Sequence, residues 1–220
     1  MWSFNKRDLR QLIFIIVFTL FYSSETYSNI GDFQGKIKIL KEGIYDTLTV
    51  EIFIKDKFIR VDEYKKDKKP VRSFIANTSS GNIYLVSYQH KMYSLVKVNP
   101  SSSNNDVEII KSENFIEVNG KKCYQWRVKD KASQTVTTYW VAKIEYNFEP
   151  KLFRILANAG SAIDEFVKMP QTPNIIPLKV VDRTRFRKLR SNLQIIEISS
   201  MKLSESLFKI PNGFSELISG

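Results

Sequence analysis

Histidine and cysteine are almost absent from this sequence of 220 residues, which contains one of each, His90 and Cys123. Cysteine-rich zinc sites, multi-histidine metal centres and disulfide frameworks need more of these residues, so all three are excluded. Glycine is also scarce, with eight residues, and no glycine-rich loop of the kind that binds nucleotide phosphates occurs. We therefore expect no metal, nucleotide or other cofactor.

Catalytic groups are equally few. A serine or cysteine hydrolase would need His90 as its base, with a nucleophile and an orienting acid beside it, and no Gly-x-Ser-x-Gly motif occurs. The adjacent carboxylates 62–63 and 164–165 should point away from each other, because neighbours on a strand or a helix diverge. We predict a protein that is not an enzyme and has no catalytic residues; an unrecognised hydrolase is the alternative.

The first 28 residues have the layout of a signal peptide: basic residues, an apolar segment from 12 to 22, and then small and polar residues. The apolar segment has 11 residues, well short of the ~20 that a bilayer-spanning helix needs. Cleavage is therefore favoured over a permanent anchor, with a cut before Asn29 or, alternatively, after Ser23 or Ser24. We expect residues 29–220 to form a single exported domain in the periplasm, associated with the outer membrane, or secreted.

Positive charge is the strongest compositional feature, with a net charge of +11. In an exported protein the natural acidic partner is an anionic membrane surface, whereas nucleic acid lies in another compartment. The densest cluster comprises Arg183, Arg185, Arg187, Lys188 and Arg190, with Phe186 and Leu189 between them. At the tip of a hairpin these residues could contact anionic headgroups; the alternative is a solvated turn whose charges oppose aggregation.

Short alternating segments separated by turn residues predict an antiparallel sheet of many strands. Strands are expected at 33–39, 47–54, 57–64, 72–76, 82–87, 91–98, 115–118, 121–129, 135–142, 175–181 and 193–200. The dipeptide Asn119-Gly120 predicts a type I′ hairpin turn, which requires two positive φ angles. The polar stretch 99–106 predicts a flexible loop within the domain.

One helix is expected, from about 150 to 168, because apolar residues recur there at spacings of three and four. The fold class is therefore mainly β with α: a curved antiparallel sheet or incomplete β-barrel, with a helix packed across its concave face. Leu156, Ile163 and Phe166 lie on the apolar face of that helix. They are core residues by default, and ligand-binding residues if the concavity holds a hydrophobic ligand.

Several short motifs occur together: 33–35, 57–62, 118–123, 139–143, 176–181 and 207–211. In combination they resemble a family of uncharacterised exported bacterial proteins of unknown function, similar in fold to the LolA/LolB-like lipoprotein carriers. The resemblance implies an unclosed barrel with helices in its concavity, a location in the cell envelope and an acyl-chain cavity. It implies no catalytic residue. Arg60 fits a recurring arginine of a strand motif, and we expect its head to pair with a carboxylate.

Two functions follow as hypotheses. The first is an exported protein, taken as a monomer, that binds a hydrophobic ligand such as a lipid or an acylated protein and is oriented by basic loops at an anionic membrane. The second is a structural or interaction module of the envelope, with a fully packed core and a basic docking surface. Cys123 lies in a strand-like segment and is expected to be buried and inert.

Overall fold

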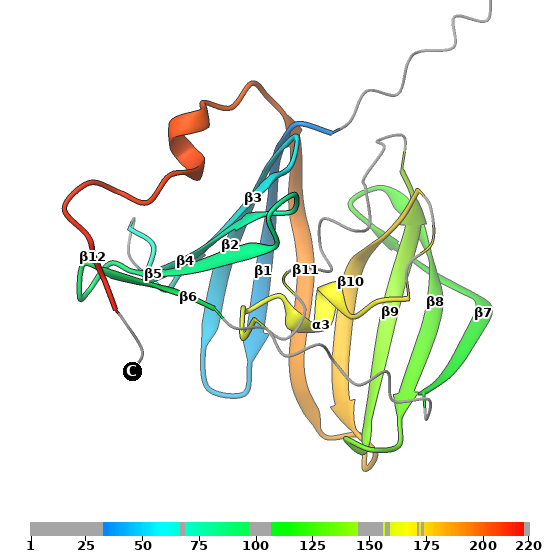
Figure 1. The fold of residues 1–220 in the computed structure, drawn as a ribbon. Helices are drawn as coiled ribbons and strands as arrows, with labels where there is room; N and C mark the ends of the chain where they lie inside the picture. The colour runs from blue at the N-terminus through cyan, green and yellow to red at the C-terminus, as the bar shows by residue number, and fades with distance from the viewer. Residues whose placement is uncertain are drawn as a thin grey trace, which may run out of the picture. The chain divides into compact units, whose positions relative to one another are not determined.

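Twelve strands form one sheet in the computed structural model, which describes residues 33–66, 69–96, 107–144, 156, 159–170, 172 and 174–217. The strand order is β12-β6-β5-β4-β3-β2-β1-β11-β10-β9-β8-β7, and each pairing is antiparallel except that of β12 with β6. The predicted signal peptide and the predicted loop 99–106 lie outside the described residues. The sheet is open, as predicted (Figure 1).

The strands are β1 (Gly35–Gly43), β2 (Thr47–Lys55), β3 (Phe58–Tyr64), β4 (Arg72–Asn77), β5 (Asn82–Ser87), β6 (Met92–Leu95), β7 (Val107–Val118), β8 (Lys121–Asp130), β9 (Thr135–Lys143), β10 (Ile175–Thr184), β11 (Leu189–Ser200) and β12 (Ser215–Glu216). The short helices are α3 (Asp164–Val167) and the 3-10 helix η1 (Glu205–Phe208). Asn119 and Gly120 both have positive φ angles, of 52° and 70°, which confirms the predicted turn. None of the described helices is long and apolar enough to cross a membrane.

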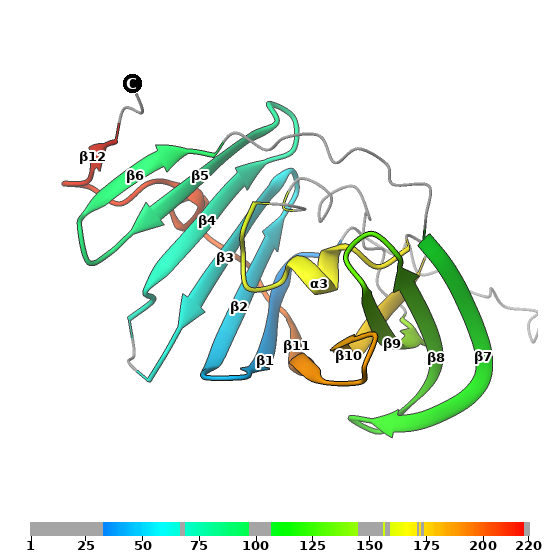
Figure 2. The ribbon, with the colours of Figure 1, turned by 90° about the horizontal axis from the view of Figure 1, so that it is seen from below.

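Two groups of strands lie on either side of β11. The first wing comprises β1 to β6 with β12, and the second wing comprises β7 to β10. β1 pairs with β11 along its whole length, whereas β10 pairs with β11 only from Lys179 to Arg183. Figure 2 shows the two wings curving around α3, which lies on the concave side.

The main core lies on that concave side. Ile37, Ile52 and Val61 are opposite one another in the register of β1, β2 and β3, and all three are fully buried. This arrangement follows from the alternation of apolar and polar residues, which turns every second side chain to the same face. The segment that we call the plug, described at residues 156 and 159–170, packs its apolar side chains against this face.

The predicted helix across the concave face is not confirmed. Helical structure in the described part of this segment is limited to the four residues of α3, and positions 150–155, 157 and 158 lie outside the described residues. Gly160 has a φ angle of +74°, which interrupts a right-handed helix. The backbone N–H of Ala162 donates to Glu63 Oε1 at 2.6 Å, so a side chain of the sheet takes a group that a continuous helix would use itself.

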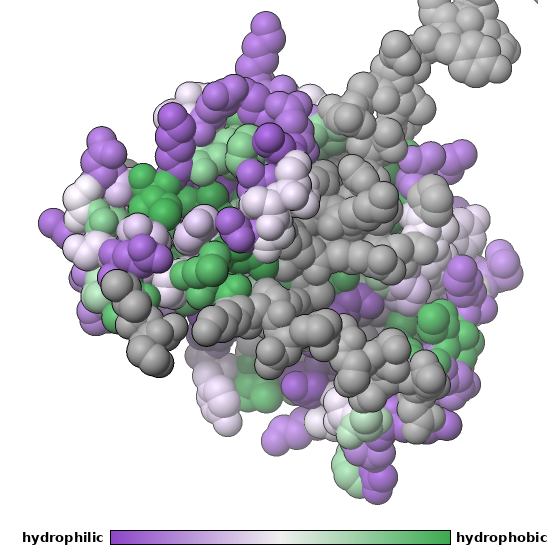
Figure 3. Space-filling model, in the orientation of Figure 1, coloured by the Kyte–Doolittle hydropathy of each residue, from purple (hydrophilic) through white to green (hydrophobic). Residues whose placement is uncertain are grey.

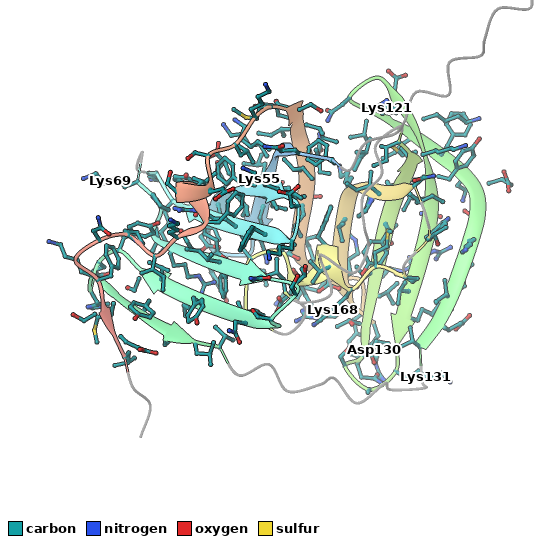
Figure 4. All side chains as sticks on the ribbon, turned by 45° about the horizontal axis from the view of Figure 1, so that its top comes forward. Lys55, Lys69, Lys121, Asp130, Lys131 and Lys168 are labelled. Carbon is teal, nitrogen blue, oxygen red and sulfur yellow. The ribbon has the colours of Figure 1, made fainter. Side chains whose placement is uncertain are left out.

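The opposite face of the first wing is covered by the C-terminal segment from Met201 to Phe214, which we call the strap. The ring centroids of Phe58 and Phe208 are 5.7 Å apart, and those of Tyr88 and Phe214 are 5.6 Å apart. Lys55 lies beside the strap and donates to the carbonyl of Leu203 at 3.1 Å (Figure 4). The first wing is therefore packed between the plug on one face and the strap on the other.

Candidate functional site

The basic cluster lies at the end of the β10–β11 hairpin. Both strands extend further than predicted, so the turn itself comprises only residues 185–188. Thr184 donates its backbone N–H to the carbonyl of Lys188, and Arg187 donates to the carbonyl of Thr184, each at 2.9 Å. Arg187 has a φ angle of 65°. We call residues 183–190 the basic tip, which Figure 1 draws at the lower end of β10 and β11.

The charges of the basic tip are mostly uncompensated. Among the described residues, Arg190 is the one member with an ion pair, at 3.1 Å between its Nη1 and Asp182 Oδ2. Arg183 instead donates to the backbone carbonyl of Arg187 at 3.1 Å, and Arg185 donates to the neutral side-chain oxygen of Gln134 at 2.6 Å. Four cationic side chains at one end of the molecule therefore have no ion-pair partner among the described residues.

Apolar side chains lie among these charges. Phe186 is 78% exposed and Leu189 is 40% exposed, and the guanidinium carbon of Arg185 lies 4.5 Å from the centre of the Phe186 ring. Figure 3 shows hydrophilic and hydrophobic residues side by side at the lower end of the molecule, where Figure 1 draws the tip. The basic tip therefore combines exposed basic and apolar side chains in one turn.

The turn between β8 and β9 lies against the basic tip. Arg185 donates its backbone N–H to the carbonyl of Gln134 at 2.9 Å. Asp130, labelled in Figure 4, stabilises this turn by accepting from the backbone N–H groups of Ala132 and Ser133 at 2.9 and 3.1 Å. These hydrogen bonds, with that from Ser133 first, lower the pKa of Asp130. Between the two turns is an open cavity of about 540 Å³.

Asp182 supports the base of the tip. It is buried and accepts a hydrogen bond from Thr137 Oγ1 at 2.8 Å, in addition to its contact with Arg190. Burial raises the pKa of Asp182, whereas Thr137 and Arg190 lower it and the charge of Glu165 raises it further. Sequence reasoning missed this carboxylate, although its position just before the basic cluster could have suggested a pairing.

The three predicted ligand-binding residues come together in the plug. Leu156 and Ile163 are fully buried, and Phe166 is 4% exposed. All three belong to the same hydrophobic core as the first wing. Their contact with the concave face is thus a structural fact, whereas a role in ligand binding is still a prediction.

Polar side chains from both wings hold the plug. From the first wing, Glu63 accepts from Arg72 Nε and from the Ala162 N–H, each at 2.6 Å, and Lys41 Nζ lies 3.1 Å from Glu165 Oε2. From the second wing, Tyr139 donates its hydroxyl to the carbonyl of Glu165 at 3.0 Å. Sequence reasoning did not identify these anchors, because their partners are far apart in the chain.

A second buried polar network holds the strap. Arg60 donates to Asp62 Oδ1 at 2.7 Å, to the carbonyl of Leu207 at 2.7 Å and to Tyr88 Oη at 2.6 Å. Ser73 also donates to Asp62. The predicted pairing of Arg60 with a carboxylate is confirmed, and Asp62 and the plug anchor Glu63 diverge to opposite faces of β3, as expected for strand neighbours.

The remaining predictions concern single side chains. His90 is exposed in a turn, as expected, and Cys123 is a buried free thiol whose pKa is raised by its burial. Within the described ranges, no three side chains of His, Cys, Asp or Glu gather in a way that could hold a metal ion. Neither single residue lies near the basic tip in the sequence, and neither is part of the networks that hold the plug and the strap.

Comparison with known proteins gives a family and a fold. Residues 33–214 match the family described as domain of unknown function DUF4412, whereas no curated protein matches significantly. An uncharacterised conserved protein from Thermus thermophilus has a similar structure, with a TM-score of 0.57, 10% identity, and coverage of 86% of this chain and 91% of that one.

Two further structures are more distant. The Pseudomonas aeruginosa MucA/MucB complex aligns with a TM-score of 0.46 and 11% identity, over 80% of this chain and 55% of that one. A Vibrio parahaemolyticus domain, described as a candidate outer membrane lipoprotein-sorting protein, aligns with a TM-score of 0.36 and 10% identity, over 82% and 90%. Because the family model covers nearly all of the described sheet, the chain belongs to the DUF4412 family.

Proposed function

We propose that this protein is a non-enzymatic binding protein of the bacterial cell envelope that docks on an anionic membrane surface through its basic tip. The observation that carries the proposal lies at one hairpin end, where four cationic side chains without an ion pair to any described residue accompany the exposed Phe186 and Leu189. Basic residues near an anionic bilayer contribute about 1 kcal/mol each. The apolar side chains add contact with the boundary between headgroups and acyl chains.

Vesicle binding tests this proposal with variants of equal charge. The triple variant Arg183→Gln, Arg185→Gln, Arg187→Gln removes three charges from the tip. The matched control Lys65→Gln, Lys66→Gln, Lys69→Gln removes three charges from exposed lysines between β3 and β4. Cosedimentation with vesicles of phosphatidylcholine and phosphatidylglycerol should weaken roughly 100-fold for the tip variant, and much less for the control. Equal losses would show that net charge alone directs binding.

A second candidate function is the binding of a hydrophobic or acylated ligand on the concave side. The plug favours it, because side chains of the sheet rather than a continuous helix hold its backbone groups. An acyl chain could replace the apolar contacts of Leu156, Ile163 and Phe166 if those polar contacts opened together. The competing account is the fully packed interaction module.

Native mass spectrometry with lipid extraction separates these two accounts. The full chain is expressed in an exporting bacterial host, and wild type is compared with Phe166→Ser, with circular dichroism to check folding. A stoichiometric lipid on the wild type, lost from a folded Phe166→Ser variant, would support ligand binding. A wild-type protein that is empty and acquires no lipid when offered vesicles would favour the packed module.

A further inference from the structure

The geometry points to the cavity beside the basic tip as a binding site for one phosphate ester that carries an apolar group, the chemistry of a phospholipid headgroup with the start of its acyl chains. This inference deepens the proposed docking function and rests on it, since the same hairpin supplies the docking surface and one wall of the cavity. Docking needs only a dense positive field, whereas the cavity would recognise an individual headgroup.

The cavity is open to solvent, and its volume is in the range of small-molecule sites. Its volume of about 540 Å³ lies within the ~300 to 1,000 Å³ that such sites span. One wall is the β8–β9 turn with Ser133 and Thr135, and the other is the basic tip with Arg185, Phe186 and Arg190. Thr135 and Thr184 are opposite each other in the β9–β10 register, so the paired strands hold the two walls together.

Both arginines are oriented before any ligand arrives. Arg185 gives Nη1 to Gln134 Oε1, while Gln134 in turn donates Nε2 to the carbonyl of Lys131 at 2.6 Å. Arg190 forms an ion pair with Asp182, with 3.1 Å between Nη1 and Oδ2. Each guanidinium has five N–H donors, and in the described residues the remaining donors of both arginines have no protein acceptor. Orientation by a neutral amide leaves the whole charge of Arg185 available to an anion.

Hydroxyl groups line the wall formed by the β8–β9 turn. Ser133 Oγ and Thr135 Oγ1 are 2.7 Å apart and one donates to the other, while the Ser133 side chain also hydrogen-bonds Asp130. The donors that face a ligand are therefore the guanidinium N–H groups of Arg185 and Arg190, and two such groups suit a tetrahedral phosphate, which can accept hydrogen bonds in several directions, better than a planar carboxylate. Arginine recognises phosphate through paired N–H groups. The exposed Phe186 ring at the rim supplies the apolar surface for the chain that the phosphate carries.

Titration with soluble probes tests the site apart from membrane docking. The probes are dihexanoylphosphatidylglycerol below its micellar concentration, glycerol 3-phosphate, and dihexanoylphosphatidylcholine. Calorimetry should show the phosphatidylglycerol binding at least tenfold tighter than glycerol 3-phosphate, which lacks the chains, and than phosphatidylcholine, whose headgroup is neutral overall. Amide chemical-shift changes should be centred on Thr135 and Thr184.

Two substitutions that leave the net charge unchanged make the test specific. Arg185→Lys keeps the charge but loses the planar guanidinium group, and Gln134→Ala removes the side chain that orients this guanidinium. Each substitution should weaken binding of the phosphatidylglycerol probe about tenfold or more. Arg127→Lys, at an exposed position of β8 outside the cavity lining, should have no effect. Unchanged affinity in Arg185→Lys, or shifts centred elsewhere, would overturn the proposed site.

The vesicle assay then separates the two proposals. Arg185→Lys vesicle binding close to wild type, together with lost probe binding, would support both a docking surface driven by charge and a distinct headgroup site. Probe binding without any vesicle binding would leave the headgroup site standing and reject docking. Binding of glycerol 3-phosphate as tightly as the phosphatidylglycerol probe would overturn the lipid source, because a free phosphate ester would then suffice.

Discussion

Strands β3 and β7 both combine apolar and polar residues but have very different environments. Five of the seven residues of β3 are buried, whereas in β7 only Val118 of twelve residues is buried. β3 lies in the middle of the first wing, with the plug on one face and the strap on the other. β7 is the last strand of the sheet. The comparison shows that the residues of a strand do not by themselves decide its burial, which depends on the segments that cover each face.

The difference in burial suggests different roles for the two wings, one in stability and one in surface contacts. The first wing contains the buried ion pair of Arg60 and Asp62 and most of the fully buried aliphatic residues, so it should contribute most of the folding free energy. The second wing presents exposed apolar residues, among them Ile109, Phe115 and Tyr124, and its β9 and β10 lead to the basic tip. Substitutions in the two wings should therefore differ in how much they change the free energy of unfolding.

The largest expected effect is on the strap network of the first wing. Arg60→Met leaves the buried carboxylate of Asp62 without its cationic partner, which should cost about 3 to 5 kcal/mol of unfolding free energy. Urea unfolding measures this loss, and limited proteolysis should detect release of the strap. The double variant Arg60→Met, Asp62→Leu should recover part of the loss. A double variant less stable than the single one would contradict this account.

Gly35 at the junction of β1 and β11 should be the next most sensitive position. A Cβ atom there would lie 2.1 Å from the backbone oxygen of Ser199, so Gly35→Ala must displace one strand from the other. We expect a loss of about 2 kcal/mol in urea unfolding. Gly213→Ala is the control, because its Cβ meets no atom within 4 Å and its positive φ should cost about 1 kcal/mol. Equal losses would show that the junction tolerates displacement.

Asp182 in the second wing should respond in the opposite direction. Its raised pKa means that the folded state binds a proton more readily than the unfolded chain, so its charge costs stability at neutral pH. This cost disappears as the pH falls through the raised pKa. Asp182→Asn should therefore be more stable than wild type at pH 7, with the difference vanishing in acid. Thermal unfolding across pH measures this, and a loss of stability at neutral pH would refute it.

The smallest effect is expected at the exposed edge of the second wing. Phe115 is 57% exposed and its ring lies 4.1 Å from Lys122 Nζ. Phe115→Ala should change the unfolding free energy by only about 0.5 kcal/mol, as measured with urea. A loss above about 2 kcal/mol would mean that another segment covers β7 in solution, and the contrast between the wings would then fail.

Local chemistry made much of the sheet predictable. Turn residues such as Asp56, Asn119 and Gly120 set the hairpins, since their positive φ angles depend on few neighbours. The plug was not predictable in the same way. Its apolar spacing is that of a helix, yet Glu63, Arg72 and Lys41 take the backbone groups of residues 160 and 162. Distant polar contacts therefore replaced local hydrogen bonds.

The candidate site was likewise predictable from the sequence only in part. The basic cluster and its exposed Phe186 could be identified by composition, because charge density belongs to the residues themselves. The cavity beside them could not, because it requires the β8–β9 turn to meet the β10–β11 turn, with Arg185 bonded to Gln134 across a separation of 51 residues. Which arginine of the tip has an ion-pair partner likewise depended on the position of Asp182.

By itself, the sequence determined the alternation of the strands, the hairpin turns and the position of the basic cluster, because these depend on residues within a few positions of one another. Only the tertiary structure decided which strand faces are covered and where the buried polar groups find partners. The deciding contacts join distant residues, as between Glu63 and Ala162, 99 positions apart, and between Arg60 and Leu207, 147 apart. Such pairs form only when the whole sheet has curved around its core.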